Sequence, residues 1–355
     1  MSNVNLLETE ILETRNSLST DRLDMSFGEI MSVYERDEII ISPDFQRLFR
    51  WSEGQKTRFI ESLLLGIPIP PIFVAEDNNG KWELVDGLQR LSTVLSFFGL
   101  LRNIENIKDN KNNWALCEGE LIKSLELYTC AELPLKFQLN IKRSSCRVEI
   151  IKWNSKIDMR YELFNRLNTG GSPLTDQEIR NCIFRGISTD FNEFLKRIAD
   201  NEDFKCLIGP TEKQLSELYL QELVLRFMSL FNNWENVNHI LSKHMTEYMR
   251  TVIRENSFDY SLESVFLRII NLLKPLGKEI FRFEGTVFST SLFDAITIGI
   301  GLNLDYYEQN IEVLKAKITE LKTNPEFKRY TGSASNNKSR VINRIKIANT
   351  IFKVV

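Results

Sequence analysis

The stretch from Trp82 to Phe98 constrains the fold most, because it has the pattern of a strand that turns directly into a helix. Its first residues, Trp82–Val85, favour a strand. Asp86-Gly87 is a turn pair, and glycine tolerates backbone angles that other residues avoid. The apolar residues that follow have helical spacing: Leu88, Leu91, Leu95 and Phe98. This junction predicts a domain that combines strands and helices.

The helix start after Gly87 is the first candidate binding site. Burial of the apolar face leaves Gln89 and Arg90 on the opposite side of the first turn, close to Asp86. A helix N-terminus presents free N–H groups and partial positive charge, which suit a phosphate. The Asp86 carboxylate is suited to hold a magnesium ion that bridges phosphates, or to orient water. The alternative is a solvated turn in which Arg90 pairs with Asp86.

Composition excludes several classes of protein. The chain has 355 residues, which is long enough for two domains. Its net charge of −3 does not favour binding to nucleic acid or to a membrane through the charge of the protein as a whole. No apolar stretch approaches the roughly 20 residues that span a bilayer, and no signal peptide is expected. The five cysteines are scattered, as in a cytoplasmic protein with reduced thiols. With only two histidines, a zinc site or a Ser-His-Asp triad is not expected.

Residues 26–153 read as an alternation of strands and helices. Residues 1–25 precede this region as an arm or a peripheral helix. Helices are expected to start at two capping boxes, Ser26/Glu29 and Ser52/Gln55. The expected strands are Glu38–Ile41, the Ile72–Val85 hairpin, Phe137–Ile141 and Arg147–Trp153.

The segment Ser42–Trp51 is predicted to be a binding loop, because it mixes arginine, glutamine and aromatic residues without a period. Its candidate binding residues are Gln46, Arg47 and Arg50. The alternative is a surface loop whose aromatic residues only dock on the core: Phe45, Phe49 and Trp51.

A second candidate loop runs from Asn165 to Leu174. Its glycine pair allows the backbone to approach a ligand closely, and its arginine is placed to hold an anion. The candidate residues are Asn165, Arg166, Asn168, Gly170 and Gly171. The alternative is a helix C-cap followed by a plain turn. Together, the three loops offer arginine forks that match phosphate oxygens, so the pocket they predict suits a nucleoside triphosphate.

From about residue 187 onward the chain is predicted to be helical. Apolar residues have helical spacing in 215–231, 240–253, 262–273, 288–302 and 311–321. Residues 322–353 then carry eight basic residues and one acid, which favours contact with DNA phosphates through Arg340, Arg344 and Lys346. The alternative is a terminal helix docked by an apolar stripe that comprises Val341, Ile345, Ala348 and Phe352.

Four motifs resemble the GmrS-type domain of GmrSD modification-dependent restriction systems, which belongs to the broader ParB/sulfiredoxin-like group. They are Asp44-Phe45-Gln46-Arg47…Trp51, Ile67–Pro71, Asp86-Gly87-Leu88-Gln89-Arg90 and Phe164–Gly171, and the resemblance covers about residues 26–185. It implies nucleotide binding and often hydrolysis, with a D-G-Q-Q-R motif at the active site. It also implies a role in defence against phage, often against modified DNA.

The sequence departs from that family in two respects. Leu88 stands where the motif commonly has glutamine; since Leu88 falls on the apolar face of the helix, the site is expected to survive. Two-domain members of the family carry a His-Asn-His-type nuclease, and His239 and His244 alone do not provide one. DNA cleavage by this chain alone is therefore not expected.

These observations lead to an explicit fold prediction. Residues 26–186 are expected to form an α+β, ParB/sulfiredoxin-like nucleotide-binding domain, and residues 187–355 an all-α domain that ends in a basic helix.

The first functional hypothesis is a magnesium-dependent nucleoside triphosphatase of a phage-defence system. Asp86 would hold magnesium or position water, and the arginines would neutralise phosphate charge: Arg47, Arg90 and Arg166. Gln46 and Gln89 would orient phosphates or ribose. The alternative is a non-hydrolysing regulatory subunit that binds DNA or nucleotide, or that holds a partner nuclease or a neighbouring defence protein.

Overall fold

The computed structural model describes most of the chain, and its contacts divide it into two units, Met1–Pro173 and Leu174–Val355. The described residues are 3–41, 49, 51–77, 79–102, 112–152, 155, 162–163, 166, 174–185, 187–231, 233–285 and 287–354. The first unit is α+β and the second is helical, as the sequence predicted.

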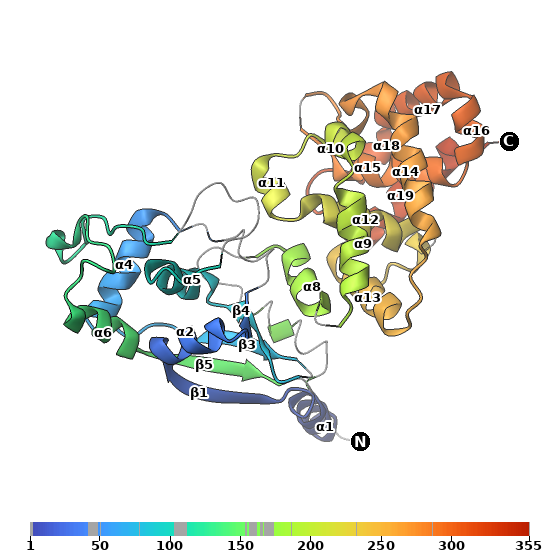
Figure 1. Cartoon of the computed structure of the whole chain (residues 1–355). Helices are drawn as coiled ribbons and strands as arrows, with labels where there is room; N and C mark the ends of the chain where they lie inside the picture. The colour runs from blue at the N-terminus through green and yellow to red at the C-terminus, as the bar shows by residue number, and fades with distance from the viewer. Residues whose placement is uncertain are drawn as a thin grey trace. The chain divides into compact units, whose positions relative to one another are not determined.

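The first unit is built on a five-stranded mixed sheet with the strand order β1-β5-β3-β4-β2 (Figure 1). β1 pairs with β5 and β3 pairs with β4 in antiparallel fashion, whereas β5–β3 and β4–β2 are parallel. The strands are β1 (Thr20–Ser26), β2 (Ile39–Ile40), β3 (Ile72–Glu76), β4 (Trp82–Asp86) and β5 (Ser145–Ile151). The expected hairpin at Ile72–Val85 is confirmed as β3 and β4. The strand expected at Arg147–Trp153 is observed as β5, and Trp153 itself lies outside the described residues.

The helices of the first unit begin largely where local chemistry predicts. Ser26 and Glu29 form a capping box at the start of α2, as do Ser52 and Gln55 at the start of α4. The helices are α1 (Asn3–Arg15), α2 (Phe27–Glu35), α4 (Glu53–Leu64), α5 (Leu88–Phe97) and α6 (Leu135–Arg143), with a short 3₁₀ turn at Lys123–Leu125. Because β1 pairs with β5 along its length, residues 20–25 belong to the sheet and not to an N-terminal arm.

The prediction of a strand at Phe137–Ile141 is wrong, because these residues lie inside α6. Phe137, Leu139 and Ile141 alternate as a strand would, but Phe137 and Ile141 are also four residues apart, which is helical spacing. Only Ile141 of this helix is fully buried, and Lys142 and Arg143 in the last turn favour a helix C-terminus.

The second unit consists of helices, and the five helical segments predicted there are confirmed as α12, α13, α14, α15 and α17. Its α-helices are α8 (Asp176–Arg185), α9 (Thr189–Ala199), α10 (Glu202–Ile208), α11 (Glu212–Ser216), α12 (Tyr219–Phe231), α13 (Leu241–Arg254), α14 (Ser261–Leu273), α15 (Thr290–Gly301), α16 (Leu304–Gln309), α17 (Ile311–Thr323), α18 (Pro325–Arg329) and α19 (Lys338–Phe352). Short 3₁₀ turns lie at Trp234–Asn236, Lys274–Leu276 and Lys278–Phe281.

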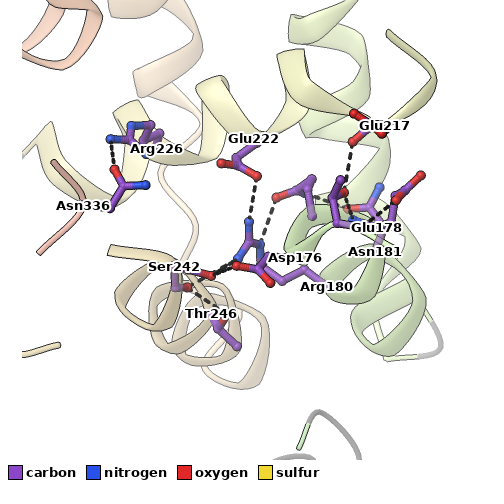
Figure 2. Close-up of polar contacts among 12 residues, drawn as sticks. Asp176, Glu178, Arg180, Asn181, Glu217, Glu222, Arg226, Ser242, Thr246 and Asn336 are labelled. Carbon is purple, nitrogen blue, oxygen red and sulfur yellow. Dashed lines mark hydrogen bonds and ion pairs between the residues drawn. The ribbon is translucent and has the colours of Figure 1, made fainter. Parts of the chain in front are cut away.

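By its contacts, helix α8 groups with the second unit, so the division between the two compact units lies after Pro173, whereas the sequence analysis placed a domain boundary after residue 186. Thr175 and Glu178 cap this helix reciprocally. Buried Arg180 then joins α8 to its neighbours: it donates to Ser242 of α13 and pairs with Glu222 of α12 at 3.4 Å (Figure 2). This side chain of α8 is thus satisfied within the helical unit.

The helical unit should lose stability in mild acid because His244 is buried. Burial lowers the pKa of His244, and its Nε2 lies 3.1 Å from the Ser229 carbonyl oxygen. A histidine with a lowered folded-state pKa binds more protons when unfolded, so its contribution to stability is lost as the pH falls below about 6.5. His244→Gln should reduce the fall in the free energy of unfolding between pH 7.5 and 5.5, measured by urea denaturation.

Thr251 provides the control for that measurement, because it is an exposed residue of the same helix, α13, and its side chain does not titrate. Thr251→Gln should retain the pH dependence of the wild-type protein. An unchanged slope in His244→Gln would show that other groups cause the acid effect.

Candidate functional site

The candidate site lies where β4 ends and α5 begins, as the sequence predicted. Asp86 is the last residue of β4, and Gly87 is the N-cap of α5. The register between β3 and β4 shifts just before this point, because Phe73 pairs with Asp86 whereas Val74 pairs with Leu84. Bulges of this kind redirect the strand, and they are frequent next to active sites.

Gly87 is required at this junction by its geometry. Its φ of +97° lies in the left-handed region, where residues with a Cβ are strained. A Cβ built on Gly87 would lie 2.5 Å from Cγ2 of Ile72, which is closer than real contacts allow. Only glycine therefore fits between β3 and the start of α5.

The three polar side chains of the motif have different surroundings. Arg90 donates from Nη2 to Oδ2 of Asp86 at 2.9 Å and from Nη1 to the Pro70 carbonyl oxygen at 2.8 Å. The Asp86 side chain remains 44% exposed, whereas that of Arg90 is only 12% exposed. The Arg90–Asp86 pair that the sequence left as an alternative is thus present, although the carboxylate still faces solvent.

Gln89 contacts the segment that leads into α4. Its Oε1 accepts a hydrogen bond from the Trp51 backbone N–H at 3.1 Å. The Trp51 ring packs edge-on against Phe59 of α4, with the ring centroids 5.6 Å apart, and Phe49 is buried. Aromatic residues of the Ser42–Trp51 segment therefore do dock on the core, as the alternative for that loop proposed.

The first turn of α5 presents backbone N–H groups next to Asp86. Its N-cap residue, Gly87, has no side chain that could cap them, and a helix N-terminus favours an anion. Leu88 is buried, which confirms that it lies on the apolar face where the family motif commonly has glutamine. The start of α5 therefore places a helix N-terminus beside an exposed carboxylate.

Most residues of the other two predicted loops lie outside the described residues: Gln46, Arg47, Arg50, Asn165, Asn168, Gly170 and Gly171. Arg166 is described. Its side chain is 75% exposed and pairs with Glu162 at 2.8 Å. These seven residues and Arg166 remain predicted members of the site.

A magnesium ion at Asp86 would depend on ligands from outside the described side chains. In the described part of the chain, no three His, Cys, Asp or Glu side chains gather in a way that could hold a metal ion. Magnesium commonly binds through one or two carboxylates and completes its shell with waters and substrate phosphates. An exposed carboxylate beside a helix N-terminus is compatible with that mode of binding.

A surface pocket of about 480 Å³ lies next to the proline-rich motif of the same unit. Its lining includes Ile67, Pro68, Ile69 and Pro71, whereas Asp86, Gln89 and Arg90 are not part of it. The candidate site is therefore defined by its side chains and helix end, and this pocket is a separate surface feature.

The prediction that Arg344 contacts DNA is wrong, because its side chain is fully buried in the helical unit and pairs with Asp294. Arg340 is half-buried and donates to the carbonyl oxygens of Arg329 and Thr331, and Lys346 is exposed. The residues of the apolar stripe are all buried, namely Val341, Ile345, Ala348 and Phe352. α19 thus docks by its apolar stripe, as the alternative proposed.

The helical unit contains a buried charged cluster that the sequence gave no signal for. Arg226 pairs with both carboxylate oxygens of Asp294, at 2.7 and 2.9 Å, and donates to Asn336 at 2.8 Å (Figure 2 shows this last contact). Arg344 contacts the same carboxylate. Because these residues are far apart in the sequence, neither spacing nor composition could bring them together.

The fold and the site define an α+β domain in which a D-G-x-Q-R turn starts a helix at the end of a sheet strand. Residues 27–185 match the family described as GmrSD restriction endonuclease, N-terminal domain. The chain therefore contains a GmrSD-type N-terminal domain, as its motifs indicated, and this domain indicates a role in a restriction-type defence system. Comparisons with curated proteins and with solved structures found no significant match.

Among the described residues, no helix is both long enough and apolar enough to cross a membrane.

Proposed function

We propose that the GmrSD-type domain binds and hydrolyses a nucleoside triphosphate with magnesium as part of a restriction-type defence system. The observation that carries this proposal is the exposed Asp86 carboxylate, held by Arg90 beside the N-terminus of α5. Phosphates would lie at the helix end, where N–H groups favour negative charge. Asp86 would bind magnesium or position the attacking water.

The remaining predicted residues would complete the site. Phosphate charge would be neutralised by Arg47, Arg50 and Arg166. Phosphates or ribose would be oriented by Gln46, Asn165 and Asn168. The backbone could approach the ligand closely at Gly170 and Gly171. DNA cleavage would require a partner nuclease. His244 is buried against the Ser229 carbonyl oxygen, and so it does not offer a nuclease histidine at the surface.

The test is phosphate release from the four ribonucleoside triphosphates with magnesium, for the wild type and Asp86→Asn. Loss of the carboxylate should reduce turnover by about 100-fold or more while the fold is retained, because asparagine keeps the side-chain shape. Asp37→Asn is the matched control, since Asp37 is also an exposed aspartate paired with an arginine, Arg102, outside the motif. Asp37→Asn should have wild-type turnover.

Two results would count against hydrolysis at Asp86. Wild-type turnover in Asp86→Asn would remove this residue from the mechanism. Absence of release from every nucleotide would favour the regulatory alternative, in which the domain binds nucleotide or DNA without hydrolysis. The exposed Lys346 would then be the residue of the basic helix to neutralise in a salt-dependent DNA-binding assay.

A further inference from the structure

The polar side chains of the motif divide into one that faces solvent and two that hold neighbouring segments. Of Asp86 and Arg90, Asp86 has the more exposed side chain, and its Oδ2 accepts a hydrogen bond from Arg90. Arg90 and Gln89 instead contact backbone groups of distant segments, Pro70 and Trp51. These contacts suggest different roles for residues that the motif places side by side.

Arg90 bridges the end of β4 to the segment before β3. Both of its terminal nitrogens are engaged, one with Asp86 and the other with the Pro70 carbonyl oxygen. Prolines lack a backbone N–H, so the Pro70–Pro71 segment cannot be held through donors of its own. The planar guanidinium is suited to join a carboxylate and a carbonyl in one fixed geometry.

Gln89 has the same kind of role toward the segment before α4. Its carbonyl oxygen accepts from the backbone of Trp51, the residue before the Ser52 N-cap, and so it fixes where that segment meets the first turn of α5. Gln89 and Arg90 together bring three separate sequence motifs to one place around Asp86.

We propose that Gln89 and Arg90 are positioning residues, and that Asp86 is the one polar side chain of the motif that acts on the nucleotide. This inference rests on the proposed function, and it replaces direct phosphate contact by Arg90 with a structural bridge. Only 12% of the Arg90 side chain is exposed, and each terminal nitrogen donates to one of two partners in the protein, Asp86 or the Pro70 carbonyl oxygen, so these two contacts fix the orientation of the guanidinium.

Substitution of Gln89 by glutamate separates the two roles for that residue. Glutamate still accepts a hydrogen bond from the Trp51 N–H, but it repels phosphate and donates nothing. Because the proposal places Gln89 on the Trp51 N–H and not on a phosphate, Gln89→Glu should keep nucleotide affinity within about threefold of the wild type, whereas Gln89→Met, which cannot accept that hydrogen bond, should lose turnover by tenfold or more. A tenfold weaker affinity in Gln89→Glu, with Gln89→Met unaffected, would overturn the proposal for this residue.

Arg90→Met tests the bridge to Pro70. We expect turnover to fall by tenfold or more, while the ratio of triphosphate to monophosphate affinity stays within about twofold of the wild type. Hydrogen exchange should increase at the amides of Ile72–Glu76, because Pro70 is no longer held. Arg90→Lys, which can reach one of the two partners, should restore part of the turnover.

Arg102→Met is the matched control, since Arg102 also joins an aspartate, Asp37, to backbone carbonyls, those of Tyr34 and Glu35. This change should loosen its own segment and leave Ile72–Glu76 unaffected. A tenfold smaller affinity ratio in Arg90→Met, with unchanged hydrogen exchange at Ile72–Glu76, would show direct phosphate contact and overturn the proposal. If the wild type neither binds nor hydrolyses nucleotide, the proposed function fails, and the exchange data still decide whether Arg90 holds Pro70.

Discussion

Replacement of Asp294 by alanine is expected to destabilise the helical unit by about 3–5 kcal/mol, because it leaves two buried arginines without their shared partner. Arg226 and Arg344 are both fully buried, and both contact this carboxylate. Nε of Arg344 already lacks a hydrogen-bond partner among the described residues. In that region of the described structure, no second carboxylate is bonded to Arg226, so no other acidic group would neutralise its positive charge.

The same cluster predicts a sensitivity to acid. Burial would raise the pKa of Asp294, but Arg226 and Arg344 outweigh it and hold this pKa below its ordinary value. An aspartate with a lowered folded-state pKa stabilises the fold above the unfolded-state value of about 3.9, and this stabilisation is lost as the pH falls below it. The difference between wild type and Asp294→Ala should therefore shrink below about pH 4.

Urea denaturation with hydrogen exchange read in α12, α15 and α19 would measure the effect. Asp305→Ala is the control, because Asp305 is 87% exposed and pairs with Arg268 at the surface, where a pair contributes about 0–1 kcal/mol. The triple variant Arg226→Met, Asp294→Leu and Arg344→Met should recover much of the lost stability, since it removes the buried arginine charges together with their partner. Asp294→Ala within about 1 kcal/mol of the wild type would contradict this account.

Gly87→Ala is expected to damage both the fold of the first unit and its proposed activity. The substitution combines left-handed strain with a Cβ 2.5 Å from Cγ2 of Ile72, so we expect a loss of about 3 kcal/mol or more. Relief of the clash would move β3 away from the start of α5. Such a shift would separate Arg90 from Pro70 and reduce nucleotide turnover at Asp86.

Gly80→Ala separates strain from steric overlap. Gly80 also has a positive φ, +79°, but a Cβ built there meets nothing within 4 Å. This control should cost only about 1 kcal/mol and leave turnover intact. Ile72→Ala should be less harmful in the Gly87→Ala background than alone, because it removes the clashing methyl group. Equal losses for the two glycine variants would show that the approach of Ile72 is unimportant.

Local chemistry determined much of the architecture. Features that depend on residues within a few positions of one another could be predicted from the sequence. They include the turn at Asp86-Gly87, the capping boxes at Ser26 and Ser52, and the long apolar stripes of the second unit. The same reason explains the error at α6, since Phe137, Leu139 and Ile141 satisfy the period of a strand and part of that of a helix. Locally ambiguous patterns are decided by what the residues pack against.

Tertiary structure decided the roles of the charged residues. The sequence placed Arg90 beside Asp86, but only the fold brought the Pro70 carbonyl oxygen to its other nitrogen. Likewise, Arg344 belongs to a basic run by sequence, and it is buried because Asp294, fifty positions away, provides its counter-charge. A charge is exposed or buried according to its long-range partners, and sequence spacing carries no record of them.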